Sequence, residues 1–199
     1  MGEKQNRSFQ LCFNGFLKVD FQGARVTSDG GLILVRELDE HPLLLFNREG
    51  DCLAAKLRPG NVHSADDWEE VLLPEIQRQH QHGKEVVVRA DAAFAKPEIY
   101  EALEERGVNY AIRIPANENL ERDIAELLPR PVGRPSIRPL VEYKSFLYQA
   151  ASWKKARRVV AKVEHHQGEL FPRVGFIVTN LTLPSRAVVR FYNKRGTAE

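Results

Sequence analysis

The stretch that decides the fold is KEVVVRADAAFAKPEIYEALEERGVNYAIRIP, residues 84–115. It holds two short apolar runs, and the first of them ends on Asp91. Between the runs, Pro97 stands where a helix can begin and Gly107 stands where it can end. A strand, a helix and a strand of these lengths predict a βαβ crossover with two parallel strands. Because α/β sheets place their chemistry after the carboxyl ends of parallel strands, Asp91 is the first candidate functional residue.

The segments before this unit predict one or two short strands, a short helix, a β-hairpin and a longer helix. In this order they lie in residues 13–31, 30–40, 41–60 and 61–83. Ser64 is predicted to cap the longer helix, whose first turn is acidic, as the helix dipole favours. Pro74 falls inside the same pattern and predicts a kink or two helical pieces.

The segments after it predict a short amphipathic helix, a basic proline-rich linker, three strands and a closing helix. In this order they lie in residues 117–129, 130–139, 140–153, 156–166, 173–181 and 185–199. The three strands have no helix between them and predict an antiparallel meander. The meander is either an inserted subdomain or an extension of the same sheet.

The closing helix, with Ser185 as its expected N-cap, carries Tyr192, Arg195 and Glu199 on one face. One interpretation is an ordinary surface pair between Arg195 and Glu199 beside a half-buried tyrosine. Asp91 has a similar alternative, as the cap of the helix that follows it. Together, Asp91 and Glu199 resemble the split carboxylates of a site in which two Mg²⁺ ions, about 4 Å apart, promote phosphoryl transfer. Such sites usually take at least three acidic groups, and the third is not identified.

The overall composition is that of an ordinary globular protein, with 43% hydrophobic and 28% charged residues among 199. The net charge of +2 is compatible with nucleic-acid binding without arguing for it. The two cysteines, Cys12 and Cys52, form no metal-binding pattern and indicate a reducing cytosol. No apolar run is long enough for a membrane span, so no membrane association is expected.

Positively charged residues are concentrated after Trp153, from the loop between the first two predicted strands of the meander into the second strand. The cluster consists of Lys154, Lys155, Arg157, Arg158 and Lys162. Such side chains can follow a phosphate backbone, and an aromatic ring beside them can stack on an unpaired base. The alternative is a solvated strand face. On the first interpretation, the predicted DNA-binding residues are Lys154, Lys155, Arg157 and Arg158.

Several segments, in the correct order, resemble the DDE transposases of bacterial insertion sequences. FYNKRGTAE (191–199) matches that family's Y-x2-R-x3-E-x6-K signature through Tyr192, Arg195 and Glu199. VVVRADAAFAKPEIYEAL (86–103) is similar to the segment around the family's second catalytic aspartate. Two further stretches also resemble the family: FQGARVTSDGGLILVRELDE (21–40) and LRPGNVHS (57–64).

The resemblance implies an α/β fold with an RNase H-like mixed sheet and a β-rich antiparallel insertion. It implies that Asp91 and Glu199 are catalytic and bind Mg²⁺ or Mn²⁺, while Tyr192 and Arg195 contact DNA phosphate or brace the site. The expected partners are transposon ends and target DNA. The chain is also expected to form a homo-oligomer or a mixed assembly with full-length transposase. The expected location is the bacterial cytoplasm, in association with the nucleoid.

Two departures from the family pattern shape the expectations. The signature's final lysine would fall after Glu199, where the sequence stops, so the chain resembles a truncated transposase. In the family, the first catalytic aspartate lies on a strand just before the hairpin, whereas here the hairpin follows Glu40 directly. We therefore expect an internal deletion at the Glu40–His41 junction and a missing first core strand. Unless the strand around residues 16–21 fills that place, the sheet should be loose or split.

The expected organisation is an N-terminal transposase segment, a partial RNase H-like catalytic core, and a linker with the β-rich insertion. These occupy residues 1–40, residues 41–128 with 182–199, and residues 129–181 respectively. The expected function is Mg-dependent DNA cleavage and strand transfer, in a catalytically defective fragment. One alternative is a non-catalytic DNA-binding remnant or regulator of a full-length transposase, and another is a decayed reading frame.

Overall fold

Strand β6 (Asn109–Ile114) occupies the interior of the main sheet, because four of its six residues are buried. It pairs in parallel with β5 (Val87–Ala90) and antiparallel with β9 (Arg173–Thr179). The computed structural model describes residues 9–11, 14–19, 41–133 and 137–194, and for the first two ranges it describes the backbone alone. Between β5 and β6 runs helix α3 (Pro97–Glu105), which has Pro97 in its first turn and is followed by Gly107 at φ 65°. The predicted βαβ crossover is confirmed.

The three strands after the linker continue the same sheet. Strands β7 (Leu140–Tyr148), β8 (Arg157–His165) and β9 form an antiparallel meander, as the sequence predicts. Because β9 pairs with β6, the sheet has the order β5-β6-β9-β8-β7. Of the two arrangements left open by the sequence, the structure therefore has the extension of one mixed sheet. Strand β5 is one edge of that sheet, and β7 is the other.

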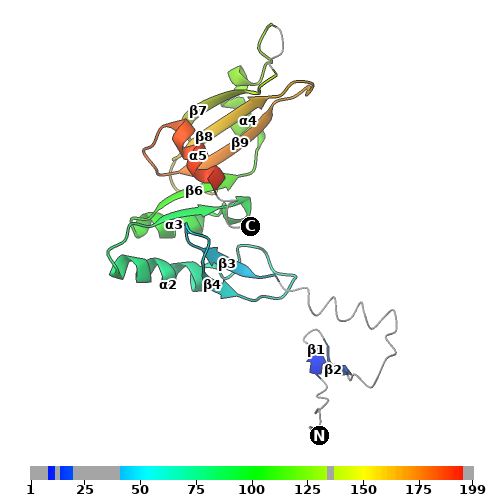
Figure 1. Cartoon of the computed structure of the whole chain (residues 1–199), viewed down its shortest axis with the longest axis vertical. Helices are drawn as coiled ribbons and strands as arrows, with labels where there is room; N and C mark the ends of the chain where they lie inside the picture. The colour runs from blue at the N-terminus through cyan, green and yellow to red at the C-terminus, as the bar shows by residue number, and fades with distance from the viewer. Residues whose placement is uncertain (1–8, 12–13, 20–40, 134–136, 195–199) are drawn as a thin grey trace.

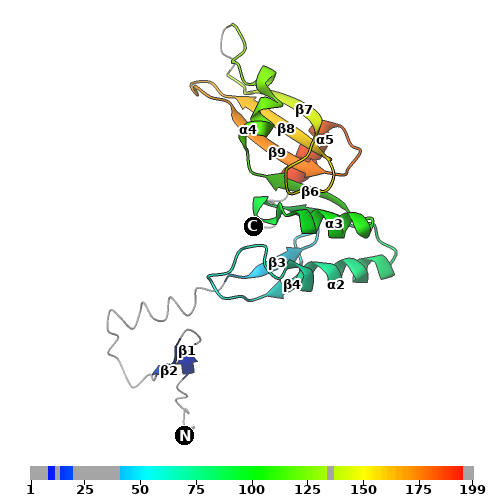
Figure 2. The same ribbon diagram turned by 180° about the vertical axis from the view of Figure 1, so that it is seen from behind.

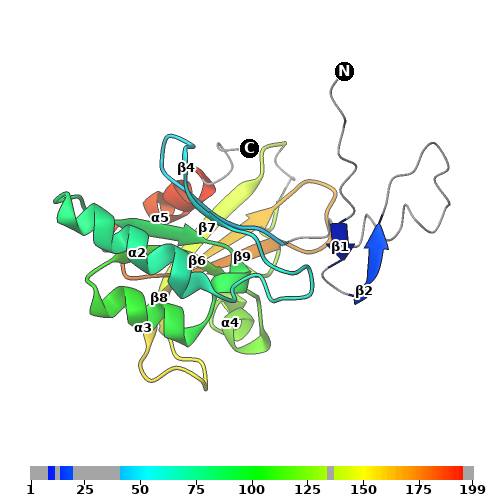
Figure 3. The same ribbon diagram turned by 90° about the horizontal axis from the view of Figure 1, so that it is seen from below.

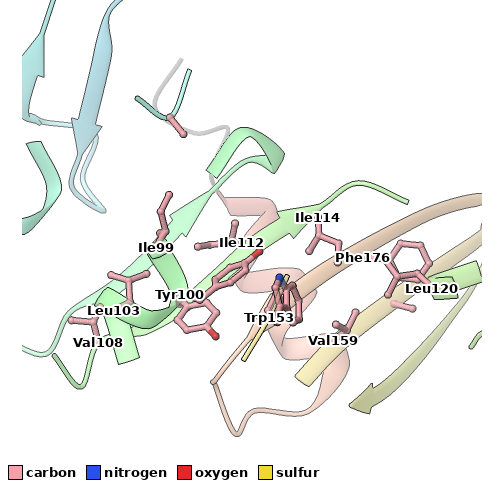
Figure 4. Close-up of a cluster of buried hydrophobic side chains, with 14 of the residues drawn as sticks. Ile99, Tyr100, Leu103, Val108, Ile112, Ile114, Leu120, Trp153, Val159 and Phe176 are labelled. Carbon is pink, nitrogen blue, oxygen red and sulfur yellow. The ribbon is translucent and has the colours of Figure 1, made fainter. Parts of the chain in front are cut away.

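Helices cover both faces of this sheet (Figures 1 and 3). On one face α3 and α4 (Glu118–Arg122) pack on alternate residues of β6, β8 and β9, and Figure 4 shows this core around Tyr100 and Trp153. On the other face α5 (Ser185–Asn193) buries Val188 and Val189. The predicted helix in residues 117–129 is divided into α4 and the 3-10 turn η2 (Ala125–Leu127). Two faces with separate cores explain why consecutive residues in the middle of β6 and β8 are apolar, at 110–112 and 159–161.

The β-hairpin predicted in residues 41–60 is confirmed as β3 (Leu43–Phe46) and β4 (Cys52–Lys56). Within the described residues it forms a separate two-stranded sheet and does not pair with β5. Figure 2 shows it beside α2 (Trp68–Gln81). Within the described residues the strands therefore form a split arrangement, which agrees with the expectation of a loose or split sheet.

The N-terminal strands form a further sheet of their own. Strand β1 (Phe9–Leu11) pairs with β2 (Asn14–Val19), which covers part of the predicted strand region. Strand β2 does not join the five-stranded sheet, so it does not take the place that the sequence analysis considers for it there. The helix predicted in residues 30–40 lies outside the described residues.

Two predicted helix caps differ in the structure, and one of the two alternatives for Pro74 is excluded. Ser64 does not cap α2, because the helix begins at Trp68 and has Asp67 at its N-cap with φ 57°. Before that point the carbonyls of His63 and Asp66 accept hydrogen bonds from the buried Arg58 side chain, which holds these residues in a turn. Pro74 lies inside one continuous helix, not between two pieces. Ser185 is the first residue of α5, and Pro184 takes the cap position.

Candidate active site at the end of strand β5

Asp91 directly follows β5, at the carboxyl end of the strand, as predicted. Its Oδ1 accepts a hydrogen bond from the amide of Ala93 at 3.0 Å and so caps the 3-10 turn η1 (Ala92–Phe94). The capping interpretation of Asp91 is therefore confirmed. A carboxylate has about four acceptor positions, and the cap uses one of them. Capping and metal binding are therefore compatible at this half-buried side chain.

A second loop is attached to the turn that follows Asp91. Lys96, just before α3, forms an ion pair with Asp66 at 3.3 Å. The amide of His63 donates to the other oxygen of Asp66 at 3.0 Å, and this bond and Lys96 hold the pKa of Asp66 below its usual range. Asp66 ends the turn that Arg58 organises. The stretch LRPGNVHS thus lies next to the loop that carries Asp91.

Helix α5 reaches the same strand from the other end of the chain. The Nη1 atom of Arg89 donates to the carbonyl of Phe191 at 3.0 Å. Its guanidinium carbon also lies 5.0 Å from the centre of the Phe191 ring. The residue after Phe191 is the predicted site residue Tyr192, which is half-buried beside the core of Val188 and Val189. The last turn of α5 is therefore held at β5, two residues along the strand from Asp91.

The two remaining residues of the signature, Arg195 and Glu199, lie outside the described residues. Their predicted meeting with Asp91 therefore stays a prediction. Within residues 41–133 and 137–194, no group of three or more His, Cys, Asp and Glu side chains could hold a metal ion. In the same part of the chain, no helix is long and apolar enough to cross a bilayer.

The four predicted DNA-binding cations between residues 154 and 158 have protein partners. Lys154 pairs with Glu101 at 2.6 Å, and Lys155 pairs with Glu104 at 2.9 Å. Arg158 donates to the Ser145 hydroxyl and to the carbonyls of Leu181 and Leu183. The side chains of Lys154 and Lys155 are nevertheless 81% and 61% exposed. A DNA contact by these two lysines stays a prediction.

Arg157 differs from its neighbours, because its side chain is only 2% exposed. It binds both carboxylate oxygens of Glu104, at 2.9 and 3.0 Å, and its guanidinium lies over the rings of Tyr100 and Trp153. Trp153 is buried at 7% exposure and packs edge-on against Tyr100 and Tyr148. In this structure Trp153 is a core residue, not a surface for stacking on a base.

The Glu104 carboxylate is the centre of this second polar cluster. Burial opposes its ionisation, but hydrogen bonds from Arg157, Lys155 and Tyr110 outweigh burial and lower its pKa. Burial and the Glu104 carboxylate raise the pKa of Tyr110, whose hydroxyl donates to Glu104 at 2.8 Å. The cluster joins α3 to β6 and to the start of β8. Its arrangement indicates a structural role.

Sequence reasoning missed Arg89, Lys96 and Glu104, although one signal for Arg89 was present. It is the only charged residue in the apolar run VVVRA, which is predicted to form a parallel strand. A charge in such a run needs a partner, and the partner here comes from a helix near the other end of the chain. Lys96 and Glu104 gave no such signal, because both stand among other polar residues.

Comparison with known proteins identifies the family of the chain. A comparison with curated proteins finds no match to the chain. The family described as transposase DDE domain group 1 matches residues 40–199, which include the hairpin, the five-stranded sheet and the whole of α5. With most of its length matched in this way, the chain belongs to the DDE transposase family.

Proposed function

We propose that this chain is a DNA-binding transposase domain with an RNase H-like core that coordinates divalent metal through Asp91 and Glu199. The observation that carries the proposal is the attachment of the last turn of α5 to β5 by Arg89, two residues from Asp91. Two segments that are distant in sequence meet there, and both belong to the matched family region. DNA is the natural partner for transposase chemistry. The location that we propose is the bacterial cytoplasm, at the nucleoid.

The oxygen chemistry of the site suits Mg²⁺ or Mn²⁺. Carboxylates are the protein ligands that Mg²⁺ favours, and Asp91 presents one at a loop after a parallel strand. When bound, the metal would stabilise charge on the attacking and leaving oxygens of a phosphodiester. Asp91 and Glu199 would hold it, while Tyr192 and Arg195 would contact a DNA phosphate or brace the carboxylates.

We also propose that the chain alone performs little or no strand transfer. The support is topological: β5 is an edge of its sheet, and the β3–β4 hairpin forms a separate sheet. The family places its first catalytic aspartate on a strand between these two elements. In the family that strand precedes the hairpin in sequence, whereas here the hairpin follows Glu40 directly, and within the described residues no strand joins the hairpin to β5. The chain is therefore short of one acid of the catalytic set.

DNA binding would persist without cleavage. Lys154 and Lys155 are exposed enough to exchange their carboxylate partners for phosphates. Arg157 would contribute indirectly, by fixing the β7–β8 turn on α3. The partners would be transposon ends and target DNA, in a homo-oligomer or in a mixed assembly with full-length transposase.

The test combines a binding and a nicking assay on duplex DNA that carries the inverted repeats flanking the gene. We expect binding that weakens steeply with salt, and no robust nicking with Mg²⁺ or Mn²⁺. The double variant Lys154→Met/Lys155→Met should reduce the slope of log K against log salt by about 2, since each phosphate contact contributes about 0.9. Lys84→Met, an exposed lysine at the turn before β5, serves as the matched control.

Two outcomes would contradict the proposal in different ways. Robust Mg²⁺-dependent nicking that is lost in Asp91→Ala would show that the catalytic set is complete. Absence of DNA binding at low salt would exclude the DNA-binding function itself.

The split sheet also favours a second candidate, a non-catalytic regulator of a full-length transposase. A chain with an open edge at β5 can enter a mixed assembly and lower its activity. Adding the purified chain to a full-length relative in a strand-transfer assay should then inhibit the reaction at stoichiometric concentrations. Inhibition only in excess over DNA sites would instead indicate competition for DNA.

A further inference from the structure

Arg89 lies on the face of the sheet that α5 covers. In the parallel ladder it stands opposite Ala111 of β6, and paired residues in a ladder point to the same face. Ala111 is fully buried in the core formed with Val188 and Val189 of α5. Since side chains alternate along a strand, Asp91, two residues after Arg89, leaves the backbone on this same side.

The contacts of Arg89 are those of a helix cap supplied from another element. Carbonyls in the last turn of a helix have no partner within it, and they form the negative end of the helix dipole. The carbonyl of Phe191, 102 residues from Arg89 in the sequence, accepts the amide of the C-cap residue Lys194 and, as a second donor, the cationic side chain of Arg89. The same guanidinium lies over the ring of Phe191, so a single side chain fixes both the backbone and the side chain of that residue.

We propose that Arg89 is a positioning residue that fixes the last turn of α5 relative to Asp91. The inference rests on the proposed function, because it assigns a role to this geometry in metal binding by Asp91 and the segment that α5 leads into. The acid thus directly follows the short strand that carries, two residues earlier, the anchor for the helix. A movement of the end of α5 would change the distance between the ligands without unfolding the sheet.

An arginine is suited to this role in a way that a lysine is not. The planar guanidinium can lie over an aromatic ring while one of its N–H groups donates to a carbonyl in the same region. An ammonium group can make the hydrogen bond or approach the ring, but lacks the plane that defines the orientation. Arg89→Lys should therefore retain part of the anchoring, and Arg89→Met should lose it.

The experiment measures the position of α5 and the metal affinity separately. Nitroxide labels are placed on Glu98→Cys in α3 and Arg190→Cys in α5, both exposed, after Cys12 and Cys52 are replaced by serine. Pulsed EPR then gives the distance distribution, and a titration with Mn²⁺ alone gives the affinity of the unlabelled chain. Arg113→Met is the matched control, because Arg113 is an exposed arginine on the neighbouring strand β6.

In Arg89→Met we expect a broader distance distribution and a Mn²⁺ affinity lower by about tenfold or more, as is typical when groups that orient ligands are removed. Arg89→Lys should lie between Arg89→Met and the wild type, and Arg113→Met should match the wild type in both measurements. An unchanged distance distribution in Arg89→Met, with the protein folded by circular dichroism, would overturn the proposal. Should Arg89→Met fail to fold, an Arg89→Lys protein identical to the wild type in both readouts would overturn it.

Failure of the proposed function gives a different pattern. In that case the wild type and Asp91→Asn would both fail to bind Mn²⁺ specifically. The distance distribution would still decide whether Arg89 holds α5 in place.

Discussion

The two ends of the crossover that contains α3 carry polar groups of opposite design. At the later end Glu104 receives two bonds from Arg157, one from Lys155 and one from Tyr110, so side chains from three elements converge on one carboxylate. At the earlier end the Asp91 carboxylate receives the amide of Ala93 from its own loop, at the edge of the sheet. A carboxylate surrounded by side-chain donors stabilises the fold. The local cap at Asp91 is compatible with the ligand role that we propose for it.

The comparison also clarifies the cluster of positive charge that the sequence indicates. Proximity in sequence groups Lys154, Lys155, Arg157 and Arg158, but the structure gives them different environments. The buried arginine belongs to the stabilising end, whereas the exposed lysines at its rim can serve both folding and DNA. Charge patterns in a sequence therefore locate a region without separating these roles.

The largest effect is expected when the Glu104 network is broken. Glu104→Gln should lower the free energy of unfolding by about 3 kcal/mol, because it leaves the buried Arg157 guanidinium without its counterion. Urea unfolding followed by circular dichroism measures this loss. Glu105→Gln is the control, because the side chain of Glu105, the next residue in the chain, is 76% exposed. This substitution should change the free energy of unfolding by no more than about 0.5 kcal/mol. Equal losses in the two variants would mean that the network does not stabilise the fold.

A smaller and graded effect is expected from acid. The folded-state pKa of Glu104 lies below its ordinary value of 4.5, so the unfolded chain takes up the proton first. The stabilisation by Glu104 is therefore present above that value and is lost as the pH falls through the lower, folded-state pKa. Urea midpoints measured between about pH 6 and pH 3 should decrease, and less steeply in Glu104→Gln than in the wild type. Parallel pH curves for the two proteins would contradict the assignment.

The contrast between the two ends also marks how far the sequence predicts the structure. Local signals were sufficient for the crossover, since Pro97 and Gly107 stand at the ends of α3 and apolar runs flank it. The pairing of β9 with β6 was not predictable in the same way, because it depends on contacts between residues such as Ile112 and Val178 that are distant in sequence.

In the candidate site, too, local sequence signals predict some features, whereas others depend on contacts between residues distant in sequence. Asp91 was predictable from its place after an apolar strand, and its neighbours were not. The partner of Arg89 is 102 residues away, and the partner of Glu104 is 53 residues away. The failed prediction of Ser64 as a helix cap has the same cause, because the turn around Arg58 is set by tertiary hydrogen bonds and not by local capping preference.

The smallest effect on stability is expected from a substitution of Asp91, before α3. This substitution gives the clearest contrast with Glu104→Gln. Asp91→Asn keeps an oxygen that can accept the amide of Ala93, so the free energy of unfolding should change by no more than about 0.5 kcal/mol. Its Mn²⁺ affinity should nevertheless fall by about tenfold or more, because the charged oxygen ligand is gone. Asp123→Asn, on the loop after α4, should leave that affinity unchanged. If Asp91→Asn instead destabilises the protein as strongly as Glu104→Gln and leaves Mn²⁺ binding intact, then both ends of the crossover are structural, and the site lies elsewhere.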